Sequence, residues 1–168
     1  MRVGIGYDIH PFSPKRKLIL GGVSVPYKSG LSGHSDADVL SHSIADALLG
    51  ACGERDIGYH FPPDDPKYQG ISSLFFLEEI SRLLKNKGFV IINLDSTIIA
   101  QEPRLSAYIP QMKEKIARTL KIDQTQVGIK ATSPEGLGFL GEKKGIACIS
   151  IVTIRKVSKG GENGIEDI

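Results

Sequence analysis

Residues 36–52 read DADVLSHSIADALLGAC, and this stretch decides how the rest of the chain is arranged. Its apolar residues recur at helical spacing and form one stripe, made by Leu40, Ile44, Ala47, Leu48 and Ala51. We therefore expect a helix over 36–52 that buries this stripe. Ser35 is predicted to be its N-cap, with Asp38 as the capping-box partner, and Gly53 is predicted to end it.

Strand and helix patterns lie on both sides of this helix. Strands are expected over 1–7, 89–99, 127–131 and 145–157, a hairpin over 17–25 with a Gly-Gly turn, and helices over 73–86 and 107–120. In 89–99, alternation puts Val90, Ile92, Leu94 and Ile98 on one face of the strand. The order predicts a single α+β domain over 1–157 with a mixed sheet, unlike a doubly wound dinucleotide-binding fold. Residues 158–168, SKGGENGIEDI, are expected to form a flexible C-terminal tail.

Length and composition set limits on the function. The chain has 168 residues, 40% hydrophobic and 24% charged, as is usual for a soluble globular protein of one domain. A formal charge of only +2 argues against nucleic acid as the main partner. No signal peptide and no apolar run of about 20 residues is visible, so no membrane contact is expected. The two isolated cysteines, Cys52 and Cys148, indicate a reduced compartment and a cytoplasmic protein.

A metal site is indicated by Asp8-Ile9-His10, placed where the first strand is expected to end. Residues two apart on a strand point the same way, so Asp8 and His10 can reach one ion. His42 lies on the expected helix opposite the apolar stripe, with Asp46 four residues on as the carboxylate that would accept its other ring N–H. Two imidazoles and one carboxylate leave a coordination position open, as in catalytic zinc sites. The alternative is a surface histidine paired with Asp38 or Asp46.

Two further motifs allow two interpretations each. Ser35, at a helix N-terminus, could bind an anion such as phosphate, with His34 beside it, or it could only cap the helix. Gly4-x-Gly6 suggests a dinucleotide-binding loop, but the third glycine of that motif is missing. We therefore reject the dinucleotide interpretation.

Several long motifs, in one order, carry a resemblance to a known family. They are RVGIGYDIH (2–10), GHSDADVLSHSIADALLGA (33–51), DIGYHFPPDD (56–65), TIIAQEPRL (97–105) and KATSPEGLGFLGEKKGIAC (130–148). Over residues 1–157 the chain closely resembles the 2-C-methyl-D-erythritol 2,4-cyclodiphosphate synthases of the non-mevalonate isoprenoid pathway. The resemblance implies a sheet with helices packed on one face, and a homotrimer with active sites between adjacent subunits.

The resemblance also implies an activity. The family converts 4-diphosphocytidyl-2-C-methyl-D-erythritol 2-phosphate into the 2,4-cyclodiphosphate and releases CMP. In this phosphorus–oxygen lyase reaction the 2-phosphate attacks the β-phosphorus. Zn²⁺ would be bound by Asp8, His10 and His42, and Mg²⁺ or Mn²⁺ at a second, substrate-bridged site by Glu135. His34 and the Ser133 hydroxyl would steady the transition state.

The same resemblance implies a set of substrate-binding residues. These are Asp8, Ile9, His10, His34, Ser35, Asp56, Ile57, Gly58, Phe61, Pro62, Pro63, Asp64, Asp65, Ala100, Gln101, Glu102, Pro103, Arg104, Leu105, Ser106, Thr132, Ser133, Pro134, Glu135 and Phe139. Residues 56–58 and 61–65 would line the polyol part of the pocket. Residues 100–106, with Thr132, would hold the cytidine end.

Three positions depart from the family pattern. Ser133 stands where the family usually has Thr, and Pro134 replaces a small polar residue. Glu142 stands where a basic, phosphate-contacting residue is common, and Lys143 or Lys144 would have to compensate for it. Ser133 keeps the hydroxyl, but Pro134 and Glu142 support one alternative, a homologue that binds nucleotides or isoprenoid diphosphates without catalysis. A zinc hydrolase with a metal-bound water is the other.

Overall fold

The computed structural model describes residues 1–157, so the expected C-terminal tail lies outside the described residues. The strands are β1 (Arg2–Pro14), β2 (Leu18–Leu20), β3 (Val23–Val25), β4 (Ser29–Leu31), β5 (Phe89–Ile99), β6 (Val127–Thr132) and β7 (Gly145–Lys156). The helices are α1 (Val39–Cys52), α2 (Ile57–His60), α3 (Leu74–Asn86), α4 (Ile109–Leu120) and α5 (Gly138–Gly141), with 3-10 turns η1 (Pro66–Tyr68) and η2 (Gln124–Gln126). Within residues 1–157, no helix is both long and apolar enough to span a bilayer.

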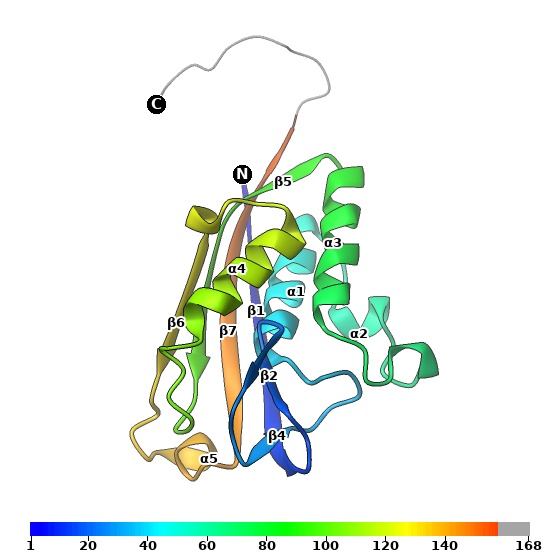
Figure 1. The fold of residues 1–168 in the computed structure, drawn as a ribbon. Coiled ribbons are helices and arrows are strands. Elements are labelled where there is room, and N and C mark those ends of the chain that lie inside the picture. The colour runs from blue at the N-terminus through cyan, green and yellow to red at the C-terminus, as the bar shows by residue number, and fades with distance from the viewer. Residues whose placement is uncertain (158–168) are drawn as a thin grey trace.

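Five strands form one sheet in the order β4-β1-β7-β5-β6. β5 and β6 run parallel and the other neighbours run antiparallel, which confirms the predicted mixed sheet. Helices α1, α3 and α4 lie on one side of the sheet, with α1 directly against β1 and β7 (Figure 1). The hydrophobic core fills the space between this helical layer and the sheet.

Two glycines of β1 explain how close α1 comes to the sheet. A Cβ atom at Gly4 would lie 2.0 Å from the carbonyl oxygen of Ala47, and one at Gly6 would lie 2.0 Å from that of Ser43. No side chain fits at either position, so the backbones of strand and helix touch directly. The Gly4-x-Gly6 motif is therefore a packing feature, which agrees with the rejection of a dinucleotide-binding loop.

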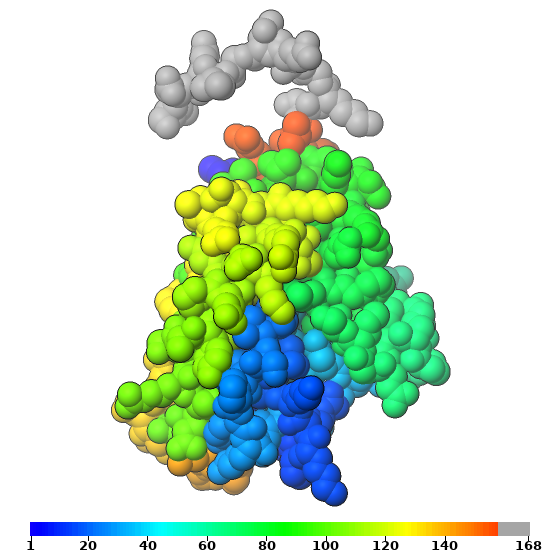
Figure 2. Space-filling model, viewed as in Figure 1, coloured from blue at the N-terminus to red at the C-terminus, as the bar shows by residue number. Residues whose placement is uncertain are grey.

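The predicted hairpin is confirmed, and it is tied to the start of α1. The two glycines of its turn, Gly21 and Gly22, have positive φ angles of 56° and 69°. Their N–H groups donate to the two carboxylate oxygens of Asp38, at 2.9 and 2.8 Å. The blue surface of the hairpin lies beside the yellow-green surface of α4 (Figure 2). The hairpin thus closes one end of the helical layer.

Three expectations about local structure are wrong: the end of β1, the start of α1 and the residue that caps α1. β1 extends to Pro14, so Asp8 and His10 lie inside the strand and not at its end. α1 begins at Val39, and its N-cap is Asp38, whose side chain accepts from the Ser41 N–H; Ser35 lies three residues earlier. The helix starts later because Ala37 has a positive φ of 57°, which is incompatible with a right-handed helix.

The strand predicted over 89–99 is confirmed in its bounds but not in its faces. A bulge between Ile91 and Asn93 shifts the register of β5 against β7. Val90, before the bulge, is exposed, while Leu94 and Ile98, after it, are buried. One extra residue in a strand reverses the side-chain alternation beyond it.

The side of the sheet away from the helices carries exposed apolar residues. On β1 and β7 these are Val3, Ile5, Tyr7, Ile149 and Ile151. We call them the outer face. The most exposed of them is Ile5, with 68% of its surface accessible to solvent. A row of large apolar side chains in water is typical of a protein–protein interface.

Candidate functional site

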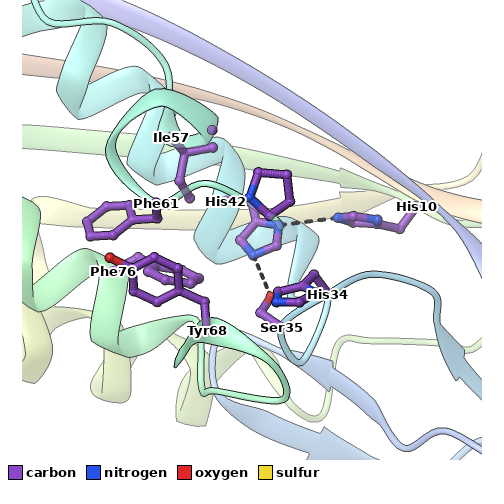
Figure 3. Close-up of a pocket in the computed structure, with 10 residues that line it drawn as sticks. His10, His34, Ser35, His42, Ile57, Phe61, Tyr68 and Phe76 are labelled. Carbon is purple, nitrogen blue, oxygen red and sulfur yellow. Dashed lines mark hydrogen bonds between the residues drawn. The ribbon is translucent and has the colours of Figure 1, made fainter. Parts of the chain in front are cut away.

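Three potential metal ligands converge where α1 crosses β1. The Oδ2 atom of Asp8 lies 3.0 Å from Nε2 of His10 and 3.1 Å from Nδ1 of His42. The two imidazole nitrogens are 3.2 Å apart (Figure 3). Asp8 and His10 point to the same side of β1, as predicted, and α1 supplies the third ligand. Among the residues that the structure describes, this is the one group of three or more side chains suited to a metal ion.

The triangle formed by these three atoms fits a zinc ion. Nitrogen and carboxylate ligands lie about 2.0–2.1 Å from zinc, so two ligands in a tetrahedral site are roughly 3.3 Å apart. The three edges, 3.0, 3.1 and 3.2 Å, are close to that value. A small outward movement would admit the ion, and one coordination position would stay open.

The protonation of Asp8 and His42 is compatible with binding of a metal ion. Burial by itself would raise the pKa of Asp8, but hydrogen bonds from His10 and His42 outweigh it and hold that pKa well below its ordinary value. Burial would lower the pKa of His42, and the Asp8 carboxylate outweighs it and raises that pKa. Asp8 is therefore ionised, and a divalent cation would replace the shared protons between the three groups.

The second ring nitrogen of His42 faces the opposite way from Asp8. Its Nε2 atom lies 2.8 Å from the Ser73 hydroxyl and 3.1 Å from the Ser35 hydroxyl. Asp46, expected to be the partner of this nitrogen, instead accepts a hydrogen bond from the Ile57 N–H at 2.8 Å. The expected role of Asp46 is therefore not supported by the contacts of the structure.

The segment that carries His34 and Ser35 is held from two sides. The Arg16 guanidinium donates to the carbonyl oxygens of Gly33 and Ser35, at 2.6 and 2.5 Å. The His34 ring lies 3.2 Å from the carbonyl oxygen of Asp65, which places the two predicted phosphate- and polyol-binding segments together. Arg16 was not among the predicted site residues, because its contacts are made across a turn of the chain.

A cavity of about 160 Å³ opens beside the three ligands. Its walls come from β1, α1, α2, α3 and the connecting loops, and they are mostly apolar (Figure 3). The lining residues are His10, His34, Ser35, His42, Ile57, Gly58, Phe61, Pro63, Tyr68 and Phe76. We call this the metal-side pocket. Tyr68 and Phe76 were missed from the sequence, where an aromatic residue in a helix or turn is indistinguishable from a core residue.

A second cavity, of about 350 Å³, lies at the ends of β5 and β6. Its lining includes seven of the eight residues expected to hold cytidine, namely Ala100, Gln101, Pro103, Arg104, Leu105, Ser106 and Thr132. Ala131 and Ser133 complete the lining. We call this the nucleotide-side pocket. The Gln101 carboxamide oxygen accepts from the Gly136 N–H at 2.9 Å, and the Ser133 hydroxyl from the Glu135 N–H at 2.9 Å. Glu135 thus belongs to the nucleotide side and is exposed.

The two pockets share no lining residue. β1, which carries Asp8 and His10, and β6, which leads to Ser133, are separated in the sheet by β7 and β5. Three strand spacings amount to about 14 Å. Within one chain, His34 and Ser133, both expected at the reacting phosphates, therefore belong to different pockets.

The remaining predicted residues lie around these pockets. Asp56 caps α2 by accepting from the Tyr59 N–H, Asp65 pairs with Lys67 at 2.8 Å, and Phe139 on α5 is exposed. Ile9 is half-buried, and Pro62 and Asp64 are exposed in the loop after α2.

Glu142 has a cationic neighbour. Lys144 lies 2.5 Å from its carboxylate, whereas Lys143 pairs with Glu102 at 2.6 Å. Lys144 is thus paired with Glu142 and Lys143 with Glu102, and compensation for the missing basic residue stays a prediction. Pro134, another of the three departures, accepts a hydrogen bond from the Leu137 N–H at its carbonyl oxygen.

Fold and site together define an α+β protein with an open, three-ligand centre suited to a divalent metal, beside a part-apolar pocket. The sequence model of the YgbB family matches residues 1–155, and the chain belongs to this family.

Relatives and solved structures agree with this family. The chain is 58% identical over 151 residues to the 2-C-methyl-D-erythritol 2,4-cyclodiphosphate synthase of Clostridium kluyveri, covering 90% of this chain and 92% of that one. It is 54% identical over 156 residues to the synthase of the same name from Geotalea uraniireducens, covering 93% and 99%. A structure described as "IspF (Plasmodium falciparum) CDP complex" superposes with a TM-score of 0.82 and 36% identity, covering 94% of this chain and 97% of that one.

Proposed function

We propose that the protein is a 2-C-methyl-D-erythritol 2,4-cyclodiphosphate synthase, a lyase of the non-mevalonate isoprenoid pathway. It converts 4-diphosphocytidyl-2-C-methyl-D-erythritol 2-phosphate into the cyclic diphosphate and releases CMP. The observation that carries this proposal is the Asp8-His10-His42 triangle beside a pocket bordered by His34 and Ser35, in a chain of this family. Asp8, His10 and His42 would hold Zn²⁺, and Glu135 would hold Mg²⁺ or Mn²⁺ bridged by substrate.

The reaction brings two anionic groups of one molecule together. The bound ions would polarise phosphate oxygens and cancel their charge when present. His34 and Ser35 at the rim of the metal-side pocket would donate hydrogen bonds to the phosphates and orient them. The attacking group is a phosphate, so no side chain has to remove a proton from it. Much of the rate would come from holding the tethered nucleophile against the β-phosphorus.

The apolar wall of the metal-side pocket suits the branched carbon chain of the polyol. Ile57, Phe61 and Pro63 would pack against its carbon atoms, while Gly58 leaves room beside them. Residues 100–106 and Thr132 would bind the cytidine end in the nucleotide-side pocket. The CDP named for the Plasmodium falciparum structure supports a cytidine nucleotide as ligand. No nucleic acid or membrane partner is proposed.

Two features support a homotrimer with active sites between subunits. The metal-side and nucleotide-side pockets belong to different ends of one sheet, so a neighbouring subunit would complete each site. The exposed apolar outer face offers the surface through which copies of the chain would associate. Ser133 and Glu135 of one subunit would then act at the metal ligands of the next. Two free, buried cysteines support a cytoplasmic location.

Phosphorus NMR of the reaction tests the proposal. Protein, cytidyl substrate and Mg²⁺ should yield two coupled resonances of a cyclic diphosphate together with CMP. His42→Ala should abolish this turnover and lose the bound zinc, measured by elemental analysis. Recovery of unchanged substrate would indicate a nucleotide-binding protein, and linear phosphate products would indicate a hydrolase. Either result would overturn the proposal, as would an unchanged zinc content in the His42→Ala variant.

A further inference from the structure

His42 is held between two groups of side chains, one at each ring nitrogen. Nδ1 faces Asp8 and His10, at 3.1 and 3.2 Å. Nε2 faces the hydroxyls of Ser73 and Ser35, at 2.8 and 3.1 Å. A neutral imidazole can bind a metal only through the nitrogen that lacks the proton. The proton must therefore stay on Nε2 if Nδ1 is the ligand atom.

Ser73 is the nearer of the two hydroxyls, and it is fully buried, with 0% exposure. It occupies the N-cap position of α3, where a serine side chain normally accepts from a backbone N–H of the first helical turn. Here it makes no such bond. Its hydroxyl instead lies between His42 and the carboxylate of Asp36. The helix thus loses a cap that its sequence could provide, and the hydroxyl serves the metal ligand.

Asp36 determines the direction of these hydrogen bonds. Its carboxylate receives the Ser73 hydroxyl, the Ser73 N–H at 3.1 Å and the Asp38 N–H at 3.3 Å. A carboxylate can only accept, so the Ser73 hydroxyl donates to Asp36. The lone pairs of that hydroxyl are then left for the Nε2–H of His42. Each bond in the series Asp36, Ser73, His42 has one permitted direction.

We propose that Ser73 and Asp36 are positioning residues that keep the Nε2 proton on His42 and aim Nδ1 at the metal. The inference rests on the proposed role of His42 as a zinc ligand. In this role Ser73 takes the place expected of Asp46, whose carboxylate instead accepts from the Ile57 N–H. Partners of this kind, one bond removed from the metal, typically change affinity by about 10–100-fold when they are lost.

Ser35 adjoins this series but has a second role. Its hydroxyl lies 3.2 Å from the Ser73 hydroxyl and 3.1 Å from Nε2 of His42. Its hydroxyl accepts the Ala37 N–H at 3.3 Å and borders the metal-side pocket. Ser73 does not line that pocket, so it cannot touch substrate there. Loss of Ser73 should therefore change metal binding, and loss of Ser35 should mainly change phosphate binding. This difference separates positioning from substrate contact.

The test is a zinc competition titration with a chromogenic chelator. We expect Ser73→Ala to weaken zinc binding about 10–100-fold, and Ser73→Thr, which keeps the hydroxyl, to restore most of it. Asp36→Asn should also weaken binding, because its amide NH₂ would face a backbone N–H in either orientation, that of Ser73 or that of Asp38. In the second orientation it would also donate to the Ser73 hydroxyl and reverse the series. Ser43→Ala is the matched control, since Ser43 is a buried serine on α1 whose hydroxyl contacts Leu40 and Ser150 and not the site. Its zinc affinity should equal that of the wild type.

The outcomes separate this inference from the proposed function. If the wild type binds zinc through His42 but Ser73→Ala binds it equally well, the positioning role is wrong and the metal site stands. If wild type and His42→Ala bind zinc equally, the metal site itself is wrong. Nitrogen-15 NMR of the zinc-loaded wild type gives a test without variants. It should show a protonated Nε2 on His42, and a protonated Nδ1 would overturn the inference.

Discussion

The Oδ1 atom of Asp46 lies 2.8 Å from the backbone nitrogen of Ile57 and accepts its hydrogen bond. Asp46 is on α1, four residues after His42, and Ile57 is the first residue of α2. The carboxylate therefore connects the helix that carries a metal ligand to the segment that forms the apolar wall of the metal-side pocket.

This contact predicts how Asp46 variants behave. Asp46→Ala should raise the KM for the cytidyl substrate several-fold, because the Ile57 N–H loses its partner and the wall of the pocket loosens. Zinc content should stay near one per subunit. Asp46→Asn should have the smaller effect, because its carbonyl oxygen can still accept. Steady-state kinetics and elemental analysis check both, and a loss of zinc as complete as in His42→Ala would return Asp46 to the role first expected of it.

The sequence predicted those parts of the site that depend on local spacing. Asp8 and His10 lie two apart on a strand, and His42 is in a helix that the spacing of its apolar residues predicts, so their elements and the shared direction of Asp8 and His10 followed from the pattern. Ser73 and Tyr68 reach the site only through the packing of α3 against α1 and of Tyr68 against Phe76 on α3. No short-range signal in a sequence encodes such a contact. Residues of this kind were missed for that reason.

The errors in local structure have an equally physical cause. Capping motifs predict a helix start to within a few residues, but the positive φ of Ala37 is imposed by the surrounding fold. The bulge at Ile91 and Asn93 is likewise fixed by pairing with β7, and a continuous strand pattern does not reveal it. Features set by neighbours in space were thus the ones that pattern alone placed wrongly.

Asp38 is expected to be the most costly carboxylate to remove. It is fully buried and accepts four hydrogen bonds, from the N–H groups of Gly21, Gly22 and Ser41 and from the Ser41 hydroxyl. Asp38→Ala would leave these buried donors without a partner, and we expect a loss of about 3 kcal/mol or more in the free energy of unfolding. Urea unfolding followed by circular dichroism measures it.

Asp123→Ala is the control for this loss. Asp123 caps the 3-10 turn η2, and its bonds to Thr125 are exposed. Its removal should cost about 1 kcal/mol or less. Equal losses in the two variants would show that burial does not set the cost at Asp38.

The thiol of Cys148 should be nearly inert in the folded protein. Burial raises its pKa from 9.0 to about 12, so at pH 8 its thiolate fraction falls by about three orders of magnitude. Alkylation by iodoacetamide at pH 8 should therefore be far slower in the native protein than in urea. A Cys52→Ser background isolates the signal, and equal rates in both states would contradict the assigned burial.

The same shift affects stability at high pH. The folded-state pKa lies above the unfolded value, so the protonated thiol favours the folded state. This contribution is fully present below about pH 9 and is lost as the pH rises through 12. In Cys148→Ala the fall in stability over that range should be shallower than in the wild type.

The outer face gives the sharpest test of how the site is completed. Ile5→Glu places a charge among apolar side chains on β1 that are exposed in one subunit, and burying it in an interface would be costly. We expect the mass in solution to fall from a trimer to a monomer, measured by light scattering. Zinc content should persist, because Asp8, His10 and His42 all come from one subunit. Turnover should fall by at least about 100-fold, because the nucleotide-side pocket and Glu135 would no longer face those ligands.

Mass, zinc content and turnover, measured together, distinguish a site shared between subunits from a site within one subunit. Arg118→Glu, an exposed charge reversal on α4 in the helical layer, is the matched control and should leave mass, zinc and turnover unchanged. A monomeric Ile5→Glu variant with full activity would mean that one subunit folds the substrate across its own sheet, over the distance of about 14 Å between β1 and β6. Loss of activity with zinc retained is the result that a site shared between subunits requires, because only the contribution of the neighbour has then been removed.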